Sequence, residues 1–464
     1  MVTLALGLFN INSFSTVAAD EDLENSTVRF LSSFYEIRSE AIVNSSKANI
    51  FLNNYSEEYI ELRKHEINRI NFYQNWIKQF DGTINEMHSD IYAIKDSFQV
   101  NNNKASIKVY EWITILWTRE KENIDVNNLP VVKELEKLYQ STDDLLLKKN
   151  LPYRIKELKW EIENIPTNVN SGAGVYHIVT LLMENNSFKI LKDSYDEGKD
   201  LTRSPDFIET NQNKNKNLIS SKGFSNPITV ISPQYYPQAT YNSDNALWYA
   251  DQCVADYRPD NIEFDYYNLN YVDCNSLSED SLSAREYQLG INIHGGGGDC
   301  TNYVSQCLFA GGERMIKNGW YYDNHGTGIT DPNDPNYWNL YWMSDDTSSP
   351  SWRSVPDLRN FILNYLRGTI SSNFTYAVKG DLVENGYHVM IVHENSGSSL
   401  YIDAHNNDRK NFPISYSWLH NPTDGEAPYE AVQMYHLYPL ILNGSDDFFY
   451  PQSFPIIRMA DRRP

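Results

Sequence analysis

The first half of the chain changes its hydrophobic period from helical to alternating. Apolar residues recur at helical spacing between residues 24 and 80, which predicts helices there. Helical spacing returns after Pro130, a residue suited to a first helical turn. Strands are predicted where apolar and polar positions alternate, at residues 105–117, 175–183 and 188–195. Helices followed by long antiparallel strands predict an α+β domain over residues 24–200.

The end of this region has a distinctive hairpin pattern. The segment GVYHIVTLLMENNSFKILKDSYDE, residues 174–197, resembles the final hairpin of cone-shaped folds such as nuclear transport factor 2. The resemblance implies a pocketed, cone-like accessory domain without naming an activity. A helical spacer with a small sheet is the alternative, and the pattern leaves both open.

A polar, proline-containing stretch at residues 201–237 predicts a linker to a second domain at residues 238–445. This domain begins with a helix capped near Ser243, and a second helix is predicted at residues 301–310. Three short strands follow, at residues 381–384, 388–393 and 400–405. The second domain is therefore also expected to be α+β.

Cys300 lies at or near the predicted start of the second of these helices, and a run of four glycines precedes Asp299 and Cys300. A helix N-terminus carries partial positive charge, which stabilises a thiolate and lowers the pKa of a thiol. Its free backbone N–H groups can also stabilise an oxyanion. Cys300 is therefore a candidate nucleophile. The alternative for a lone cysteine is a small buried hydrophobe.

A candidate base follows in the strands. His388 is predicted at the beginning of a strand, where its imidazole can face a cleft and accept the thiol proton. Asp403 and His405 lie two residues apart on the next strand and therefore share a face. Either can orient His388 by hydrogen-bonding its second ring nitrogen. His393 is interpreted as structural or as a surface residue.

The residues around Cys300 have several candidate roles. Asp299 is interpreted as a helix cap or as a group that tunes the thiol. The backbone N–H of Thr301 is a candidate oxyanion donor, and Asn302 either binds substrate or caps the helix. Cys307, two turns further on, is expected to pack in the core.

Several motifs of the second domain occur together, in order, in one known family. DCTNYVSQCLFAGG at residues 299–312, GDL at 380–382 and HVMIVHE at 388–394 resemble the putative amidase domain of secreted Gram-positive bacterial proteins. That family is similar in layout to the NlpC-type and CHAP papain-like hydrolases. The resemblance implies a papain-like fold, in which a helix-borne cysteine packs on an antiparallel sheet.

The resemblance also implies roles for individual residues. Cys300 matches the nucleophile and His388 the base. The family's HTxD-like pattern falls on His405 to Asp408 and favours His405 as the third residue, whereas alignment with NlpC-type strands favours Asp403. The glycine run and the acidic segment between Ala250 and His294 depart from the family pattern.

Charge and motifs limit the partners and cofactors. The formal net charge of −22 repels nucleic acid and anionic lipid, so we expect neither as a partner. We predict no metal, because the histidines and cysteines lack the short spacing of zinc sites and HExxH is absent. No cofactor is expected, since no phosphate-binding glycine motif fits its context.

The N-terminus and the cysteines bear on localisation. Residues 1–19 combine an apolar run with small residues before an acidic start, which predicts a truncated signal peptide without its basic region. No apolar run reaches the ~20 residues that span a bilayer. We therefore expect a secreted protein, with association with the cell wall as an additional expectation. Cys253 and Cys274 form either one disulfide or two buried thiols.

Together these features predict a secreted cysteine amidase or peptidase-like hydrolase that cleaves an amide bond in cell-wall peptides. The cell-wall substrate rests on analogy with related folds. A non-catalytic papain-like module that binds cell-wall or peptide ligands is the alternative. Acyl transfer in place of hydrolysis also stays open.

Overall fold

The computed structural model describes residues 19–47, 51, 60–94, 97–120, 125–143, 145–184, 187–195, 241–254, 300–312, 355–365, 368–405, 408–422 and 427–434. Within this part, two compact units are distinguished by their internal contacts. The first unit contains residues 19–119 and 168–195, and the second contains residues 120–167 and the described residues from 241 onward. None of the described helices is both long enough and apolar enough to cross a membrane.

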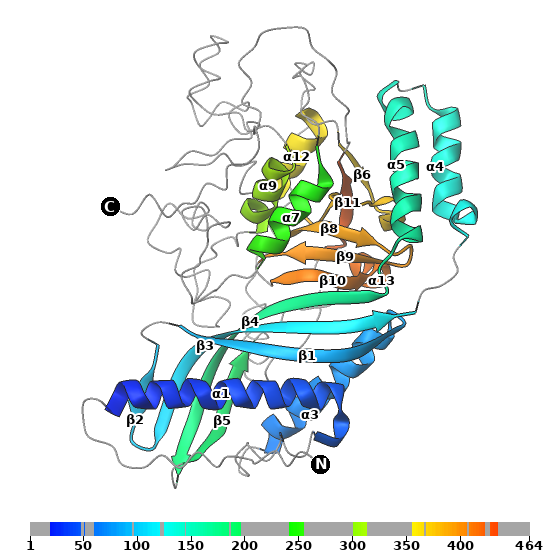
Figure 1. Cartoon of the computed structure of the whole chain (residues 1–464). Helices are drawn as coiled ribbons and strands as arrows, with labels where there is room; N and C mark the ends of the chain where they lie inside the picture. The colour runs from blue at the N-terminus through cyan, green and yellow to red at the C-terminus, as the bar shows by residue number, and fades with distance from the viewer. Residues whose placement is uncertain are drawn as a thin grey trace, which may run out of the picture. The chain divides into compact units, whose positions relative to one another are not determined.

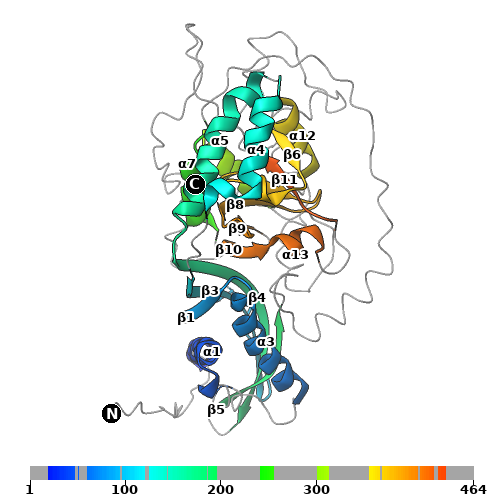
Figure 2. The same ribbon diagram turned by 90° about the vertical axis from the view of Figure 1, so that its right-hand side faces the viewer.

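The first unit consists of helices packed on one face of an antiparallel sheet (Figures 1 and 2). The sheet order is β1-β3-β4-β5, and β2 pairs with the start of β3. Its elements are α1 (Ala19–Val43), η1 (Ser45–Lys47), α3 (Ile60–Lys78), β1 (Gly82–Ala93), β2 (Gln99–Asn101), β3 (Lys104–Arg119), β4 (Asn168–Glu184) and β5 (Ser187–Tyr195). This arrangement is α+β, as predicted; the resemblance to cone-shaped folds stays a prediction.

Strand β3 shows why the alternating pattern identified a strand. Its odd-numbered residues are buried, among them Ile107, Ile113 and Trp117, while the even-numbered residues between them are mostly partly exposed. A period of two places these apolar side chains on one face of the sheet. Glu111 occupies the same buried face, so the strand also carries a charge into the interior.

The second unit has a six-stranded antiparallel sheet in the order β10-β9-β8-β7-β11-β6. Helices α7, α9 and α12 lie together against this sheet (Figure 1) and share one apolar core with it. The elements before the sheet are η2 (Val126–Asn128), α4 (Pro130–Ser141), α5 (Leu145–Glu163), α7 (Ser243–Cys253), α9 (Cys300–Ala310) and α12 (Val355–Tyr365). Those in and around the sheet are β6 (Thr369–Ser371), η7 (Phe374–Tyr376), β7 (Leu382–Glu384), β8 (Val389–Asn395), β9 (Ser399–Ala404), β10 (Arg409–Ser415), α13 (Tyr416–His420) and β11 (Glu430–Gln433).

The division into units differs from the one predicted at the level of the sequence. The prediction placed all of residues 24–200 in one accessory domain, whereas residues 120–167 cluster with the second unit. The reason is packing: apolar residues of α4 and α5 form one cluster with Val378 of the second unit. Most of the predicted signal peptide, the linker 201–237, Cys274 and Asp299 lie outside the described residues.

Candidate active site

Cys300 is the first residue of α9, and its side chain is 3% exposed. The helix buries Tyr303, Val304 and Leu308, which recur at helical spacing and face the core. Two polar contacts fix α9 on α7. The Tyr303 hydroxyl donates to the Ala250 carbonyl at 3.0 Å, and the Tyr249 hydroxyl donates to Gln306 Oε1 at 2.6 Å.

The environment of Cys300 suits a thiol nucleophile. The hydroxyl Oγ1 of Thr301 lies 3.9 Å from Cys300 Sγ. The thiol stands where the helix dipole is positive and where backbone N–H groups have no partner within the helix. Asn302 lies in the same first turn; its side chain and the residue Asp299 are outside the described part. Cys307 is fully buried on the core face, as predicted.

His388 lies immediately before β8, in the turn that joins β7 to β8. The side chain of Asn385 shapes this turn: its Oδ1 accepts the backbone N–H groups of Tyr387 at 3.0 Å and His388 at 2.8 Å. Gly386 has a φ of 85°, in the left-handed region that favours glycine. The backbone of His388 is therefore held by a compact hydrogen-bonded turn, with its side chain partly buried.

The strand register brings His405 to the same end of the sheet. Strand β8 pairs with β9 with Ile391 opposite Asp403. Continued by two residues, this register places His405 beside Val389, the residue that follows His388. The ring of Tyr303, one turn beyond Cys300 on α9, stacks on the ring of His405 with centroids 4.7 Å apart. The start of α9, the start of β8 and the end of β9 therefore meet.

Asp403 has a different partner. Its Oδ2 is 2.9 Å from Nδ1 of His393, and its Oδ1 accepts the backbone N–H of Asn411 at 2.6 Å. Burial acts to lower the pKa of His393, but the Asp403 carboxylate raises it above the usual value. The structure thus pairs Asp403 with His393, further along β8 than His388.

The role of His393 could not be read from the sequence. The register of β8 on β9 shifts between Val392 and Glu394, as in a β-bulge. Because Ile391 lies opposite Asp403, His393, two residues further along β8, lies on the same face as Asp403. Only the pairing of the two strands reveals it.

His393 and Asp403 form a cluster with Asp251 of α7. Their ligand atoms lie within 4.8 Å of one another, a spacing that could hold a cation. The ammonium of Lys410 already lies 3.4 Å from Asp251 Oδ1, and His393 has a raised pKa and a bond to Asp403. These groups supply positive charge from the protein itself, so we assign no metal to this cluster.

Comparison with known families assigns a family to the region that contains these residues. Residues 240–425 match the family model of the putative amidase domain. The match extends from α7 through α13, includes Cys300, His388 and His405, and leaves α4 and α5 outside it. It supports a hydrolase-like role for the second unit. Neither a curated protein nor a solved structure matched the chain.

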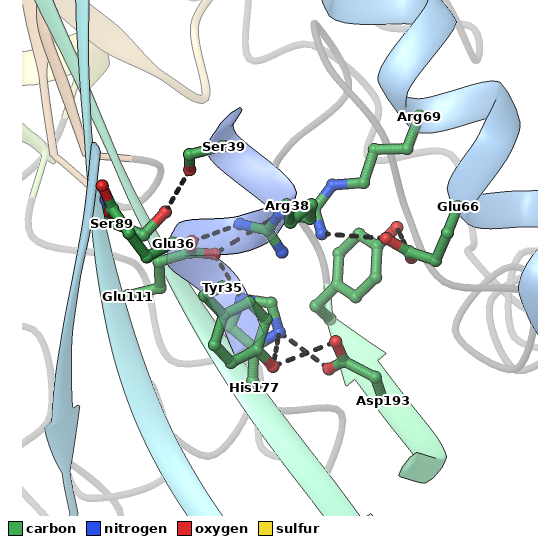
Figure 3. A network of polar contacts seen from close by, with 11 residues as sticks. Tyr35, Glu36, Arg38, Ser39, Glu66, Arg69, Ser89, Glu111, His177 and Asp193 are labelled. Atoms are coloured by element: carbon green, nitrogen blue, oxygen red, sulfur yellow. Dashed lines mark hydrogen bonds and ion pairs between the residues drawn. The ribbon is translucent and has the colours of Figure 1, made fainter. Parts of the chain in front are cut away.

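The first unit contains a second cluster of ionisable groups, outside the putative amidase domain (Figure 3). Its centre is the fully buried His177, with Nδ1 2.8 Å from Asp193 and Nε2 3.0 Å from Glu111. Arg38 forms an ion pair with Glu111, and the Tyr35 hydroxyl donates to Asp193 at 3.0 Å. Burial acts to lower the pKa of His177, but the charge of Asp193 raises it. Because both ring nitrogens face carboxylates, the imidazole offers no lone pair to a substrate, and we interpret this network as structural.

Proposed function

We propose that the second unit is a cysteine-dependent amidase with Cys300 as nucleophile and His388 as general base. The observation that carries this proposal is the position of Cys300. It begins a helix that packs over the end of the sheet where His388 enters β8. The family match supports the amidase class, and the helix N-terminus supports activation of the thiol.

The proposed reaction has two halves. His388 takes the thiol proton, and the Cys300 thiolate forms a bond to the amide carbonyl carbon. The C–N bond then breaks as His388 returns the proton to the departing amine, leaving a thioester. Water, deprotonated by His388, attacks the thioester and releases the carboxylic acid and the free thiol. Backbone N–H groups of residues 300 and 301 stabilise the oxyanion in both halves.

We propose His405 as the residue that orients His388. Continuing the β8–β9 register places it opposite Val389, the residue that follows His388, and its ring is held by stacking on Tyr303. Asp403, the other candidate, instead binds His393 and the backbone of Asn411. A group whose two oxygens already have these partners is a poorer choice for holding the base.

The substrate and location belong to the same proposal. An amide bond in a cell-wall peptide is the substrate class we favour, with the protein secreted. The sequence resemblance to secreted Gram-positive proteins and the signal-like residues 1–19 support this assignment.

The test is alkylation of Cys300 as a function of pH. Wild type is compared with Cys300→Ala, His388→Ala and Cys307→Ala; the last removes a fully buried thiol of the same helix as a control. We expect labelling well below about pH 8, lost in Cys300→Ala, weakened in His388→Ala and unchanged in Cys307→Ala. Labelling that rises only near the ordinary thiol pKa and ignores His388 would disprove the proposal.

A non-catalytic binding module is the second candidate. The observation in its favour is the burial of Cys300, which is 3% exposed, because inert structural cysteines are typically buried. This candidate predicts that a peptide ligand binds equally to wild type and to Cys300→Ala, with no turnover of any amide. Turnover by wild type that Cys300→Ala abolishes decides for the enzyme.

A further inference from the structure

The helical hairpin α4–α5 is reached from the first unit but packs in the second. Strands β3 and β4 pair as far as Thr118 opposite Asn168, so the chain leaves their sheet and returns to it at neighbouring positions. The residues between, 120–167, cluster with the second unit. The putative amidase domain match begins only at residue 240, so this hairpin lies outside the matched region.

The hairpin shares an apolar core with the segment that precedes β7. Val378 is completely buried in a cluster with residues of η2, α4 and α5, and Tyr376 packs against the same cluster. The other buried members are Val126, Val131, Val132, Leu135, Leu151, Ile155, Leu158 and Ile162. Burial of apolar side chains from both segments in one cluster stabilises the contact between them.

Arg154 of α5 places a buried charge at the centre of this contact. Its side chain is 4% exposed and forms a two-pronged ion pair with Asp381, with Nη1 3.3 Å from Oδ1 and Nη2 bonded to Oδ2. It also donates to the carbonyl of Tyr376 at 2.8 Å and to that of Met434 at 3.2 Å. All three guanidinium nitrogens therefore have partners in the second unit.

Asp381 connects this guanidinium to the candidate active site. Its carboxylate accepts the backbone N–H groups of Val378 at 2.8 Å and Met434 at 2.7 Å. Its carbonyl accepts the N–H of Val392, in β8, at 2.7 Å. The turn that carries His388 joins β7, which begins next to Asp381, to β8, whose Val392 is bonded to Asp381.

A second contact secures the same segment. Glu161 of α5, 5% exposed, accepts the backbone N–H of Lys379 at 2.9 Å. The residues from Tyr376 to Asp381 are thus held by side chains of a hairpin whose sequence lies more than two hundred positions earlier. Removal of one partner of a buried ion pair leaves an uncompensated charge, so such a pair strongly couples the two elements.

We propose that the α4–α5 hairpin is an integral part of the amidase fold in this protein and that Arg154 is a positioning residue, acting on the His388 turn through Asp381. The catalytic unit is then discontinuous in sequence and requires residues well before the family domain. The effect on catalysis rests on the proposed function, whereas the structural role of the hairpin does not.

The test compares Arg154→Gln with Lys159→Gln in the full chain. Both variants remove one cation from α5, but Lys159 pairs with Glu136 at the surface. Two readouts are taken: amide hydrogen exchange at Val378, Val392 and Met434, and the alkylation rate of Cys300 against pH. If Arg154→Gln does not fold, Arg154→Lys is used, which keeps the charge but loses the two-pronged geometry.

We expect Arg154→Gln to speed exchange at these three amides at least about tenfold and to move the labelling of Cys300 toward the pH of an ordinary thiol. Adding Asp381→Asn should restore part of the protection, because no buried charge is then left unpaired. Lys159→Gln should change neither readout.

Unchanged exchange in Arg154→Gln would overturn the proposal. Faster exchange with an unchanged Cys300 profile would overturn the positioning role and keep the structural one. A wild-type thiol without activation would overturn the proposed function, while the exchange data would still decide on the hairpin.

Discussion

The pKa of a buried carboxyl group in this protein depends on the charged and hydrogen-bonding groups around it. Burial alone would raise the pKa of Glu111, but the charge of Arg38 and the hydrogen bond from His177 hold that pKa well below its usual range. Glu161 is also buried, and its carboxyl group accepts the backbone N–H of Lys379. Burial raises its pKa to about 8, and nearby Glu157 and Asp381 add to the effect. Near neutral pH, Glu111 is therefore ionised, whereas Glu161 is mostly protonated and neutral.

Glu161→Gln should remove a loss of stability that occurs in the second unit as pH rises. Between the ordinary carboxyl pKa and about 8, the folded chain holds a proton that the unfolded chain lacks, so stability falls as pH rises across this interval. Glutamine keeps the acceptor for Lys379 without a charge. The variant should match wild type near pH 4.5 and exceed its unfolding free energy by roughly 2–4 kcal/mol above pH 8. Denaturant unfolding at several pH values measures this, and parallel curves for the two proteins would refute it.

Asp403→Asn should act on His393 rather than on the nucleophile. Losing the carboxylate charge should lower the pKa of His393, measured by NMR titration of its ring. The pH profile of Cys300 alkylation should stay close to wild type, whereas His405→Ala should weaken it. The reverse outcome, with Asp403→Asn suppressing Cys300 reactivity, would assign the third position to Asp403.

At the scale of elements, short hydrogen-bonded turns position the chemistry. Strand β8 lies between two such turns. The Asn385 side chain holds the turn before it, which carries His388, and Ser396 holds the turn after it by accepting the N–H of Ser399 at 3.0 Å. The strand itself is buried by α9 on one face. The turn at Asn385 therefore determines where the backbone of His388 enters the site.

Asn385→Ala should loosen the turn that carries His388. Two backbone N–H groups lose their acceptor, which should cost roughly 1–3 kcal/mol of stability and reduce the alkylation rate of Cys300 below pH 8. Ser396→Ala removes comparable bonds from the other turn of β8 and serves as the control. It should lower stability without changing the alkylation profile. Equal effects of both variants on Cys300 would show that the Asn385 turn has no special role.

At the scale of the whole molecule, the two units are interleaved along the chain. Residues 120–167 belong to the second unit but lie between two strands of the first. A cut in the predicted linker 201–237 would therefore break the covalent connection between the hairpin and the segment that begins at α7. The packing between them would remain.

Cleavage at a protease site inserted in the predicted linker should leave the two fragments associated. They should elute together in native buffer and separate in denaturant, because α4 and α5 stay packed in the second unit. The control replaces residues 121–166 by a short turn, which the adjacent positions Thr118 and Asn168 allow. Its fragments should separate without denaturant. If they still elute together, contacts other than the hairpin hold the fragments.

The sequence by itself determined the elements whose cause is local. Alternation identified β3, helical spacing after Pro130 identified α4, and the run after the glycines identified α9 with Cys300 at its start. Family motifs located the putative amidase domain, and the match at residues 240–425 confirms this prediction. These features depend on neighbours within a few turns of chain, which the sequence displays directly.

Tertiary structure alone decided what depends on distant partners. The pairing of Ile391 with Asp403 brings His393 to Asp403, a contact that cannot be predicted without the register between β8 and β9. The pairing of Arg154 with Asp381 joins residues 227 positions apart and places the α4–α5 hairpin in the second unit. Both outcomes follow from the cost of burying a charge, which is met only by a partner that folding brings into contact, and no local pattern records that partner.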